Sequence, residues 1–217
     1  MKCHSSKLGF VIVYADDILL LANSRYNLQK LLAVVESEIR WLNLELNIDK
    51  CSCLRIGPRY DKDCSAIHSI CGSVIAAVTE FRYLGVHICS SRKFKCSFHS
   101  AKAKFNKVAN AVFSKLFGVA SEELLLHLLK VKCIPVLLYG TEACDHTKAC
   151  LHSLDFIVLK FGMKLFKCSN RNFVIDCLNY FDFQLPSSVI LTRSARFRDR
   201  FRFVDNAACQ YVVCTCC

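Results

Sequence analysis

The chain has 217 residues, of which 53% are hydrophobic, and its 29 basic against 18 acidic residues give a formal net charge of +11. This length and hydrophobic share exclude an intrinsically disordered protein and suffice for a large core. The charge indicates an anionic partner, with nucleic acid the commonest class and a membrane surface the second. A chain that is merely basic and soluble is the alternative.

Sixteen cysteines would suit a secreted disulfide scaffold, but such scaffolds are short and poor in core residues. The first apolar stretch is interrupted by Asp16 and Asp17 and has no small-residue cleavage site, unlike a signal peptide. The most apolar long stretch, Leu124–Tyr139, contains two lysines and a proline, so it does not predict a membrane span. We therefore expect reduced, buried cysteines in a nuclear or cytoplasmic protein that is not secreted and binds no membrane.

The first predicted element is a strand pair around Tyr14-Ala15-Asp16-Asp17. Residues 9–13 and 18–22 are large or β-branched apolar residues without helical spacing, which predicts two strands buried on both faces. Adjacent carboxylates at the reversal repel each other unless water or a cation lies beside them. Hard divalent cations take such oxygen ligands, whereas an ordinary Asp-rich turn is the alternative.

The next segment predicts one amphipathic helix that starts at Asn23-Ser24, with Glu36 on its wet side and Trp41 packed beside its apolar stripe. That stripe consists of Leu28, Leu31, Leu32, Val35, Ile39, Leu42 and Leu46. Residues 46–57 then predict a turn that displays Lys50 and leads into a short strand. A lysine there suits phosphate neutralisation, although a solvated lysine is the alternative.

Residues 73–75 and 81–88 predict a small antiparallel sheet, in which Gly85 indicates a bulge or a close backbone approach. At residues 90–97 the sequence pattern changes from strand-like to helical, and four predicted helical segments follow. They begin near Phe98, at Ser121 with a break or kink at Pro135, near Thr147, and at Pro186. The last of them is rich in arginine between Arg193 and Arg202, which suits nucleic acid or a basic, frayed terminus.

The first of these helices carries Lys102, Lys104 and Lys107 opposite its apolar stripe. A lysine-lined helix face suits a phosphate backbone, and a solvated face explains it equally well. Cys144, His146, Cys150 and His152 have metal-capable side chains, but their spacing does not match a zinc-finger pattern.

Three motifs in fixed order resemble the reverse transcriptases of non-LTR (LINE-type) retrotransposons. They are the Tyr-x-Asp-Asp of residues 14–17, the Asn47-x-x-Lys50 segment, and Tyr83-Leu84-Gly85. In that family the first motif is the palm hairpin with metal-binding carboxylates, and the third begins the primer grip, before a helical thumb. Residues 132–140 also resemble a Pro-x-Leu-x-Tyr-Gly segment found downstream of that thumb.

The resemblance implies an RNA-directed DNA polymerase that uses Mg²⁺ or Mn²⁺ with an RNA template, a DNA primer and dNTPs. Asp16 would be the main metal ligand and Asp17 the supporting one. Tyr14 would lie near the primer end, and Lys50 would be the acid or electrostatic partner of the leaving pyrophosphate. Tyr83, Leu84 and Gly85 would contact the primer.

We therefore expect an α+β chain: a truncated palm with its hairpin sheet and packed helix, then an all-helical thumb-like region. The expected domains are residues 1–97, residues 98–203 and a Cys-rich, disordered tail, residues 204–217. Asp16 is the first acidic residue, so we expect one metal-binding Asp and the fingers to be missing and the isolated chain to be inactive. A non-catalytic nucleic-acid-binding module and a decayed pseudogene product are the alternatives.

Overall fold

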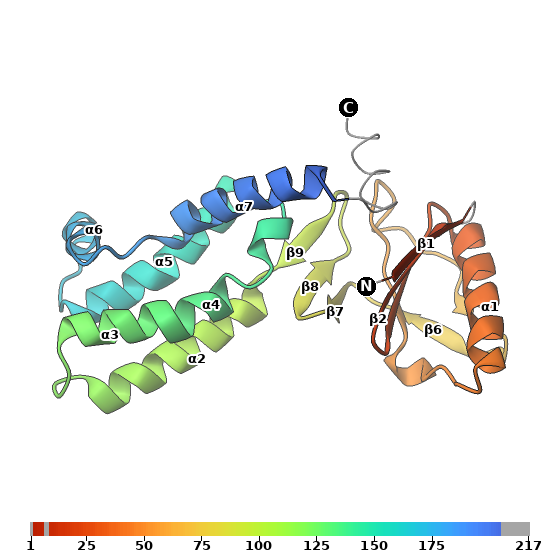
Figure 1. The fold of residues 1–217 in the computed structure, drawn as a ribbon, viewed down its shortest axis with the longest axis horizontal. Helices are drawn as coiled ribbons and strands as arrows, with labels where there is room; N and C mark the ends of the chain where they lie inside the picture. Colours follow the sequence, from red (N-terminus) through yellow and green to blue (C-terminus); the bar gives the residue numbers. More distant parts are fainter. Residues whose placement is uncertain (1, 7–8, 205–217) are drawn as a thin grey trace. The chain divides into compact units, whose positions relative to one another are not determined.

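The computed structural model describes residues 2–6 and 9–204, with the side chains of residues 9–201, 203 and 204. Its mixture of small sheets and helices confirms the predicted α+β class (Figure 1). The strands are β1 (Lys2–Ser6), β2 (Gly9–Tyr14), β3 (Asp17–Leu21), β4 (Ser52–Cys53), β5 (Ile67–His68), β6 (Val74–Ala77), β7 (Glu80–Tyr83), β8 (Val86–Cys89) and β9 (Lys95–Ser97). The longer helices are α1 (Arg25–Trp41), α2 (His99–Leu116), α3 (Glu122–Leu128), α5 (Lys148–Leu165), α6 (Arg171–Tyr180) and α7 (Pro186–Arg202). The short ones are η1 (Ile48–Lys50), η2 (Leu129–Cys133), α4 (Ile134–Leu137) and η3 (Thr141–Ala143).

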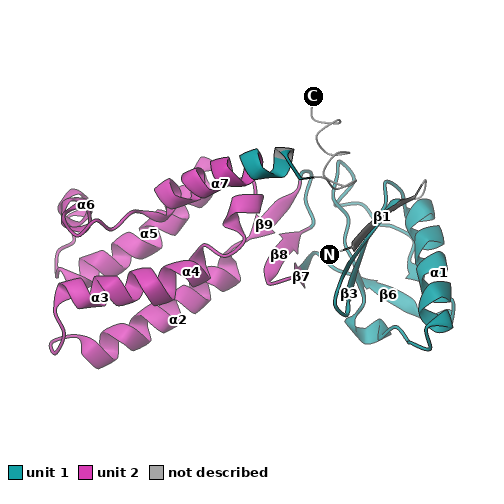
Figure 2. Ribbon diagram, in the orientation of Figure 1, with its two compact units in different colours: residues 1–81, 90–93, 199–217 teal, residues 82–89, 94–198 magenta. Residues whose placement is uncertain are grey.

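The chain divides into two compact units (Figure 2). The strand-rich unit contains residues 1–81, 90–93 and 199–217, and the helical unit contains residues 82–89 and 94–198. The domain limits expected from the sequence stay predictions, and residues 205–217 of the expected tail lie outside the described residues.

Two three-stranded sheets form the strand-rich unit. In the first, the order is β1-β2-β3 and both pairs are antiparallel, with Tyr14 opposite Asp17. In the second, the order is β4-β6-β5, with β4 parallel to β6. Helix α1 packs against β2 and β3, and Leu32 joins Ile67 and Ile75 in a small core.

The strand pair around residues 14–17 forms, but the prediction that it is buried on both faces is wrong. Every described side chain of β2 and β3 is half-buried or exposed, and Ile18 and Leu21 are exposed. The apolar runs are those of a sheet that α1 covers from one side, so the other side of each strand keeps contact with solvent.

Helix α1 begins as predicted, because the Ser24 side chain accepts a hydrogen bond from the backbone N–H of Asn27. It ends at Trp41, before the predicted stripe does, since Asn43 adopts a left-handed conformation with φ 56°. Two side chains differ from expectation. Trp41 is 80% exposed rather than packed, and Glu36 is buried because its carboxylate accepts a 2.8 Å hydrogen bond from the N–H of Ile70.

The helical unit holds the larger core, to which α2, α3, α4, α5, α6 and α7 all contribute. The predicted caps Ser121 and Thr147 accept hydrogen bonds from Leu124 and Cys150. Helix α6, capped by Asn170, was not expected from the sequence. The buried carboxylate of Asp155 accepts a 2.8 Å hydrogen bond from the N–H of Ser187 in the first turn of α7.

The predicted disturbance near Pro135 is a π-helical segment, η2, which lies between α3 and α4. Proline has no N–H to donate to the preceding turn. The extra residue of a π-turn accommodates this without separating the two helices. Leu129, Cys133 and Leu137 consequently stay fully buried along one side.

Candidate functional site

The Tyr14–Asp17 reversal is a two-residue hairpin turn. Strand β2 ends at Tyr14, β3 begins at Asp17, and Ala15 has a positive φ of 50°, whereas Asp16 does not. A positive φ confined to the first turn residue is the pattern of a type II′ turn, whose twist matches that of the flanking strands. The turn holds both carboxylates in solvent, because Asp16 and Asp17 are exposed and Tyr14 is 52% exposed.

Two exposed carboxylates fit a hard divalent cation that keeps several waters and takes further oxygens from phosphate. The donor set at the hairpin therefore suits Mg²⁺ or Mn²⁺. Within the described part of the chain, no group of three or more His, Cys, Asp or Glu side chains is arranged to hold a metal ion. This applies equally to the predicted candidates Cys144, His146, Cys150 and His152.

Lys50 lies in the same strand-rich unit, at the end of η1. The side chain of Asn47 caps this 3₁₀ turn by accepting a 3.3 Å hydrogen bond from the N–H of Lys50. The Asn-x-x-Lys spacing thus has a local structural reason. The Lys50 ammonium is exposed and free to meet an anionic group.

Tyr83, Leu84 and Gly85 belong to the helical unit, where they end β7 and form the turn into β8. Leu84 and Gly85 have φ values of 46° and 87°, the pattern of a type I′ hairpin. The sequence placed Gly85 inside a strand, and the structure places it in this turn. The expected close approach is present, because a Cβ on Gly85 would lie 2.9 Å from Cε1 of Tyr139.

Residues 139 and 140 hold this turn. The Tyr139 hydroxyl donates a 3.0 Å hydrogen bond to the carbonyl oxygen of Leu84. Gly140 has φ 70°, and a Cβ there would lie 2.6 Å from Cγ2 of Val86. Tyr139 was not among the predicted site residues. The signal that could have indicated it is the Tyr139-Gly140 pair at the end of the segment of residues 132–140, which the sequence analysis noted only for its resemblance.

The three predicted lysines of α2 do not share one exposed face. Lys104 and Lys107 are exposed, whereas Lys102 is partly buried and its ammonium donates to the Ser153 hydroxyl of α5. The interpretation of Lys102 as part of the exposed face is therefore wrong. The reason is that residue 102 lies on the side of α2 that faces α5.

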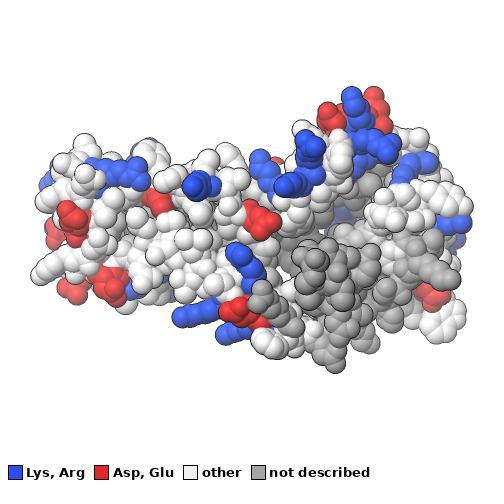
Figure 3. Space-filling view, turned by 90° about the horizontal axis from the view of Figure 1, so that it is seen from above, with Lys and Arg blue, Asp and Glu red and all other residues white. Residues whose placement is uncertain are grey.

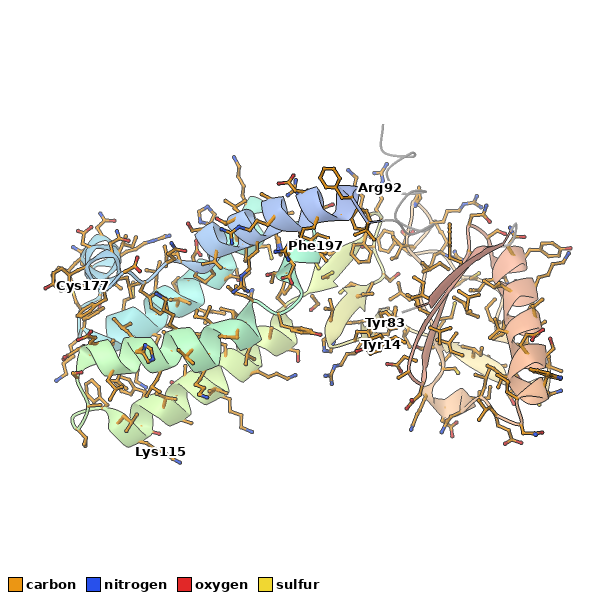
Figure 4. The ribbon with its side chains drawn as sticks, viewed as in Figure 1. Tyr14, Tyr83, Arg92, Lys115, Cys177 and Phe197 are labelled. Carbon is orange, nitrogen blue, oxygen red and sulfur yellow. The ribbon has the colours of Figure 1, made fainter. Side chains whose placement is uncertain are left out.

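Sequence reasoning missed two other lysines beside α2. Lys164 lies 4.1 Å from the centre of the Phe113 ring, and Lys167 lies 5.3 Å from that of Phe117. Lys164 lies in the last turn of α5, whereas Lys167 follows the helix with a φ of 52°, so no helical spacing in the sequence indicated the pair. On the face shown in Figure 3, basic and acidic side chains are interspersed over the helical unit. Lys115 projects outward from the end of α2 (Figure 4).

Residues 3–88 match the reverse transcriptase (RNA-dependent DNA polymerase) family. The reverse transcriptase match includes the hairpin carboxylates, Lys50 and the Tyr83-Leu84-Gly85 turn. Reverse transcriptases use divalent metal ions and bind a nucleic-acid template and primer. No curated protein and no solved structure matches the chain. None of the helices that the structure describes is long and apolar enough to cross a membrane.

Proposed function

We propose that the chain carries the palm end, primer grip and thumb of a non-LTR (LINE-type) reverse transcriptase, an RNA-directed DNA polymerase. The observation that supports this most directly is the II′-like hairpin within the matched region, which presents Asp16 and Asp17 side by side to solvent. The non-LTR type is supported by the order of the motifs, which ends with residues 132–140.

In this proposal Asp16 and Asp17 hold Mg²⁺ or Mn²⁺. A divalent ion held by these two carboxylates would supply Lewis-acid stabilisation of the negative charge that develops during phosphoryl transfer. In phosphoryl transfer the protein contributes mainly by positioning the reacting groups and by stabilising their charge. Tyr14 positions the primer end, and the Lys50 ammonium stabilises the leaving pyrophosphate.

The partners in the proposal are an RNA template, a DNA primer and dNTPs, and the location is nuclear or cytoplasmic. The Tyr83-Leu84-Gly85 turn holds the primer. The backbone of this turn is held in place by the hydrogen bond from the Tyr139 hydroxyl to Leu84 and by the close approach of Gly140 to Val86. In the same proposal, the exposed Lys104 and Lys107 of α2 contact the phosphate backbone of the nucleic acid.

Metal binding by the hairpin is tested with Mn²⁺ as a paramagnetic probe in NMR spectra of the 217-residue chain. We expect selective broadening of the amides of residues 14–18, which Asp16→Asn and Asp17→Asn weaken. The matched control is the double variant Asp61→Asn, Asp63→Asn, which removes two exposed carboxylates from a connecting loop. Equal loss of broadening in the control would show non-specific attraction of the cation.

Primer extension on an RNA template with Mg²⁺ tests the catalytic part. We expect no dNTP incorporation by the 217-residue chain alone, because the resemblance implies a further metal-binding Asp in addition to the hairpin pair. Incorporation that Asp16→Asn abolishes would show instead that this chain carries a working site. Incorporation that survives Asp16→Asn would contradict the role of the hairpin.

The exposed lysines of α2 and the arginines of α7 support a second candidate, a non-catalytic nucleic-acid-binding module. Binding through phosphate contacts weakens steeply as salt rises. We expect fluorescence anisotropy with a labelled RNA–DNA duplex to show binding at low salt and a negative salt slope. Absence of binding at low salt would contradict this candidate.

A further inference from the structure

The ends of α2 and α5 share a stack of two aromatic rings, each of which has a lysine ammonium over it. Phe113 lies in the last turn of α2 and Phe117 directly after that helix, and their rings are stacked with 4.2 Å between the centres. The Lys164 ammonium lies 4.1 Å from the centre of the Phe113 ring, and the Lys167 ammonium lies 5.3 Å from that of Phe117. The end of α5 and the residues after it therefore place two positive charges beside the end of α2.

Further contacts hold this arrangement. The Phe113 side chain is buried, and Phe161 meets its ring edge-on with 5.9 Å between the ring centres. The Lys164 ammonium also donates a 3.5 Å hydrogen bond to Oδ1 of Asn110. Because an aromatic ring attracts a cation to its face, both ammonium groups keep defined positions although both lysines are exposed. A lysine that is only solvated has no such restriction.

The charges of these lysines are not neutralised by carboxylates of the described residues. In that part of the chain no Asp or Glu forms an ion pair with Lys164 or Lys167, whose contacts are with rings and an amide. Lys160 lies one turn before Lys164 on α5 and is also exposed. Lys160, Lys164 and Lys167 together form a basic surface, which we call the α5 basic edge.

The α5 basic edge is distinct from the exposed lysines of α2. Lys102 and Phe113 both lie on the side of α2 that faces α5, because Lys102 contacts Ser153 and Phe113 contacts Phe161. At about 100° per residue, Lys104 lies half a turn around α2 from Phe113. The helical unit therefore presents lysines on two different sides.

We propose that the α5 basic edge binds the phosphates of a nucleic-acid strand, as a second contact surface besides Lys104 and Lys107. This assignment rests on the nucleic-acid binding proposed above and adds the residues of a further site. Lysine binds phosphate as a point charge. Ammonium groups that the ring stack already positions lose less freedom on binding than solvated ones do, so less of the binding energy is spent on ordering them.

Nucleic acid suits this surface better than a membrane does. An anionic membrane also attracts lysines, but membrane docking uses apolar side chains that enter the lipid. Phe117, the aromatic side chain beside these lysines, is instead engaged in the stack and under the Lys167 ammonium. The match of residues 3–88 to a family that binds nucleic acid favours the same partner.

The salt dependence of binding tests the proposal. Fluorescence anisotropy with a labelled RNA–DNA duplex gives the affinity of the 217-residue chain at several salt concentrations, and each phosphate contact contributes roughly 1 to the slope of log affinity against log salt. In the double variant Lys164→Gln, Lys167→Gln we expect a slope shallower by about 2. The matched control, Lys132→Gln with Lys148→Gln, removes two exposed lysines elsewhere in the helical unit and should keep the slope. An unchanged slope in the first variant, or an equal change in the control, would overturn the proposal.

A second variant tests the ring stack without changing the charge. Phe117→Leu keeps every lysine but removes the ring under Lys167, so binding at low salt should weaken severalfold. The control Phe173→Leu alters an aromatic side chain of α6 that is 50% exposed and should leave binding unchanged. Equal weakening by both substitutions would contradict the role of the stack.

Parallel measurements separate this site from the proposed function. If Lys104→Gln with Lys107→Gln lowers the slope and Lys164→Gln with Lys167→Gln does not, the α5 basic edge is wrong and the role of the α2 lysines stands. The reverse result supports the α5 basic edge and contradicts the role of Lys104 and Lys107. Absence of duplex binding at low salt would overturn the α5 basic edge, whereas the Mn²⁺ experiment on the hairpin is independent of it. Binding to phosphatidylserine vesicles that Lys164→Gln with Lys167→Gln abolishes, with duplex binding unchanged, would assign the surface to a membrane and overturn the proposal.

Discussion

The Tyr139 hydroxyl donates a 3.0 Å hydrogen bond to the carbonyl oxygen of Leu84, although 55 positions separate these residues in the chain. The ring of Tyr139 also occupies the space that a side chain at residue 85 would need. The Tyr83-Leu84-Gly85 motif and the Tyr139-Gly140 motif, which are far apart in the sequence, therefore contact each other in the helical unit.

Tyr139→Phe is expected to lower the free energy of unfolding by about 0.5–1 kcal/mol, because it removes one partly solvated hydrogen bond and keeps the ring. Urea denaturation measures the change. The control, Tyr180→Phe, alters a tyrosine that is 85% exposed and should change the value by less. Equal effects of the two substitutions would contradict a role for the Leu84 contact.

Gly85→Ala is expected to destabilise the chain by about 1 kcal/mol more than Gly118→Ala. Both glycines have nearly the same positive φ, 87° and 84°, so both substitutions strain the backbone similarly. A Cβ at residue 118 meets nothing within 4 Å, whereas at residue 85 it meets the Tyr139 ring. In a Tyr139→Ala background the difference between the two substitutions should vanish, and its persistence would exclude the ring as the cause.

Ala15→Gly is expected to stabilise the chain by about 0.5 kcal/mol. The left-handed conformation costs an L-residue about 1–2 kcal/mol, and the greater entropy of glycine in the unfolded chain offsets part of the gain. Ala33→Gly in α1 is the control of opposite sign, since glycine inside a helix costs about 1 kcal/mol. Destabilisation by both substitutions in urea denaturation would show that the φ of Ala15 stores no strain.

Glu36→Ala is expected to cost about 2 kcal/mol, because it leaves the N–H of Ile70 without its charged acceptor. Glu38→Ala removes a carboxylate from an exposed position two residues along the same helix and should change stability by less than about 0.5 kcal/mol. The two variants can be compared by thermal unfolding. Similar midpoints would mean that the Glu36 contact does not contribute.

Burial raises the pKa of the Cys133 thiol in the folded chain above its value in the unfolded chain. The unfolded state therefore loses the proton first as pH rises, and stability should fall above about pH 8.5. Cys133→Ala should make this fall shallower, whereas Cys177→Ala, which removes a half-buried thiol from α6, is the matched control and should alter it less. The unfolding free energy is measured between pH 7 and about pH 10. An equally steep fall in the wild-type chain and in Cys133→Ala would contradict the prediction.

Elements with local causes were predictable from the sequence. Ser24, Ser121 and Thr147 cap their helices with side chains that reach a backbone N–H three residues ahead, so the spacing alone indicates them. The reversal at residues 14–17 follows from two apolar runs around a short polar turn. Helix α6 escaped prediction because its two buried residues, Val174 and Leu178, leave only a short apolar stripe.

By itself, the sequence determined the hairpin and the capped helix that follows it, the carboxylate pair at the hairpin tip and the motifs that resemble a known family. The tertiary structure decided which groups meet: Glu36 with Ile70, Lys102 with Ser153 and Tyr139 with Leu84. Each of these pairs joins residues that lie far apart in the chain. A periodic pattern shows which side of a helix is apolar, but the partner of a polar side chain depends on which other segment packs beside it.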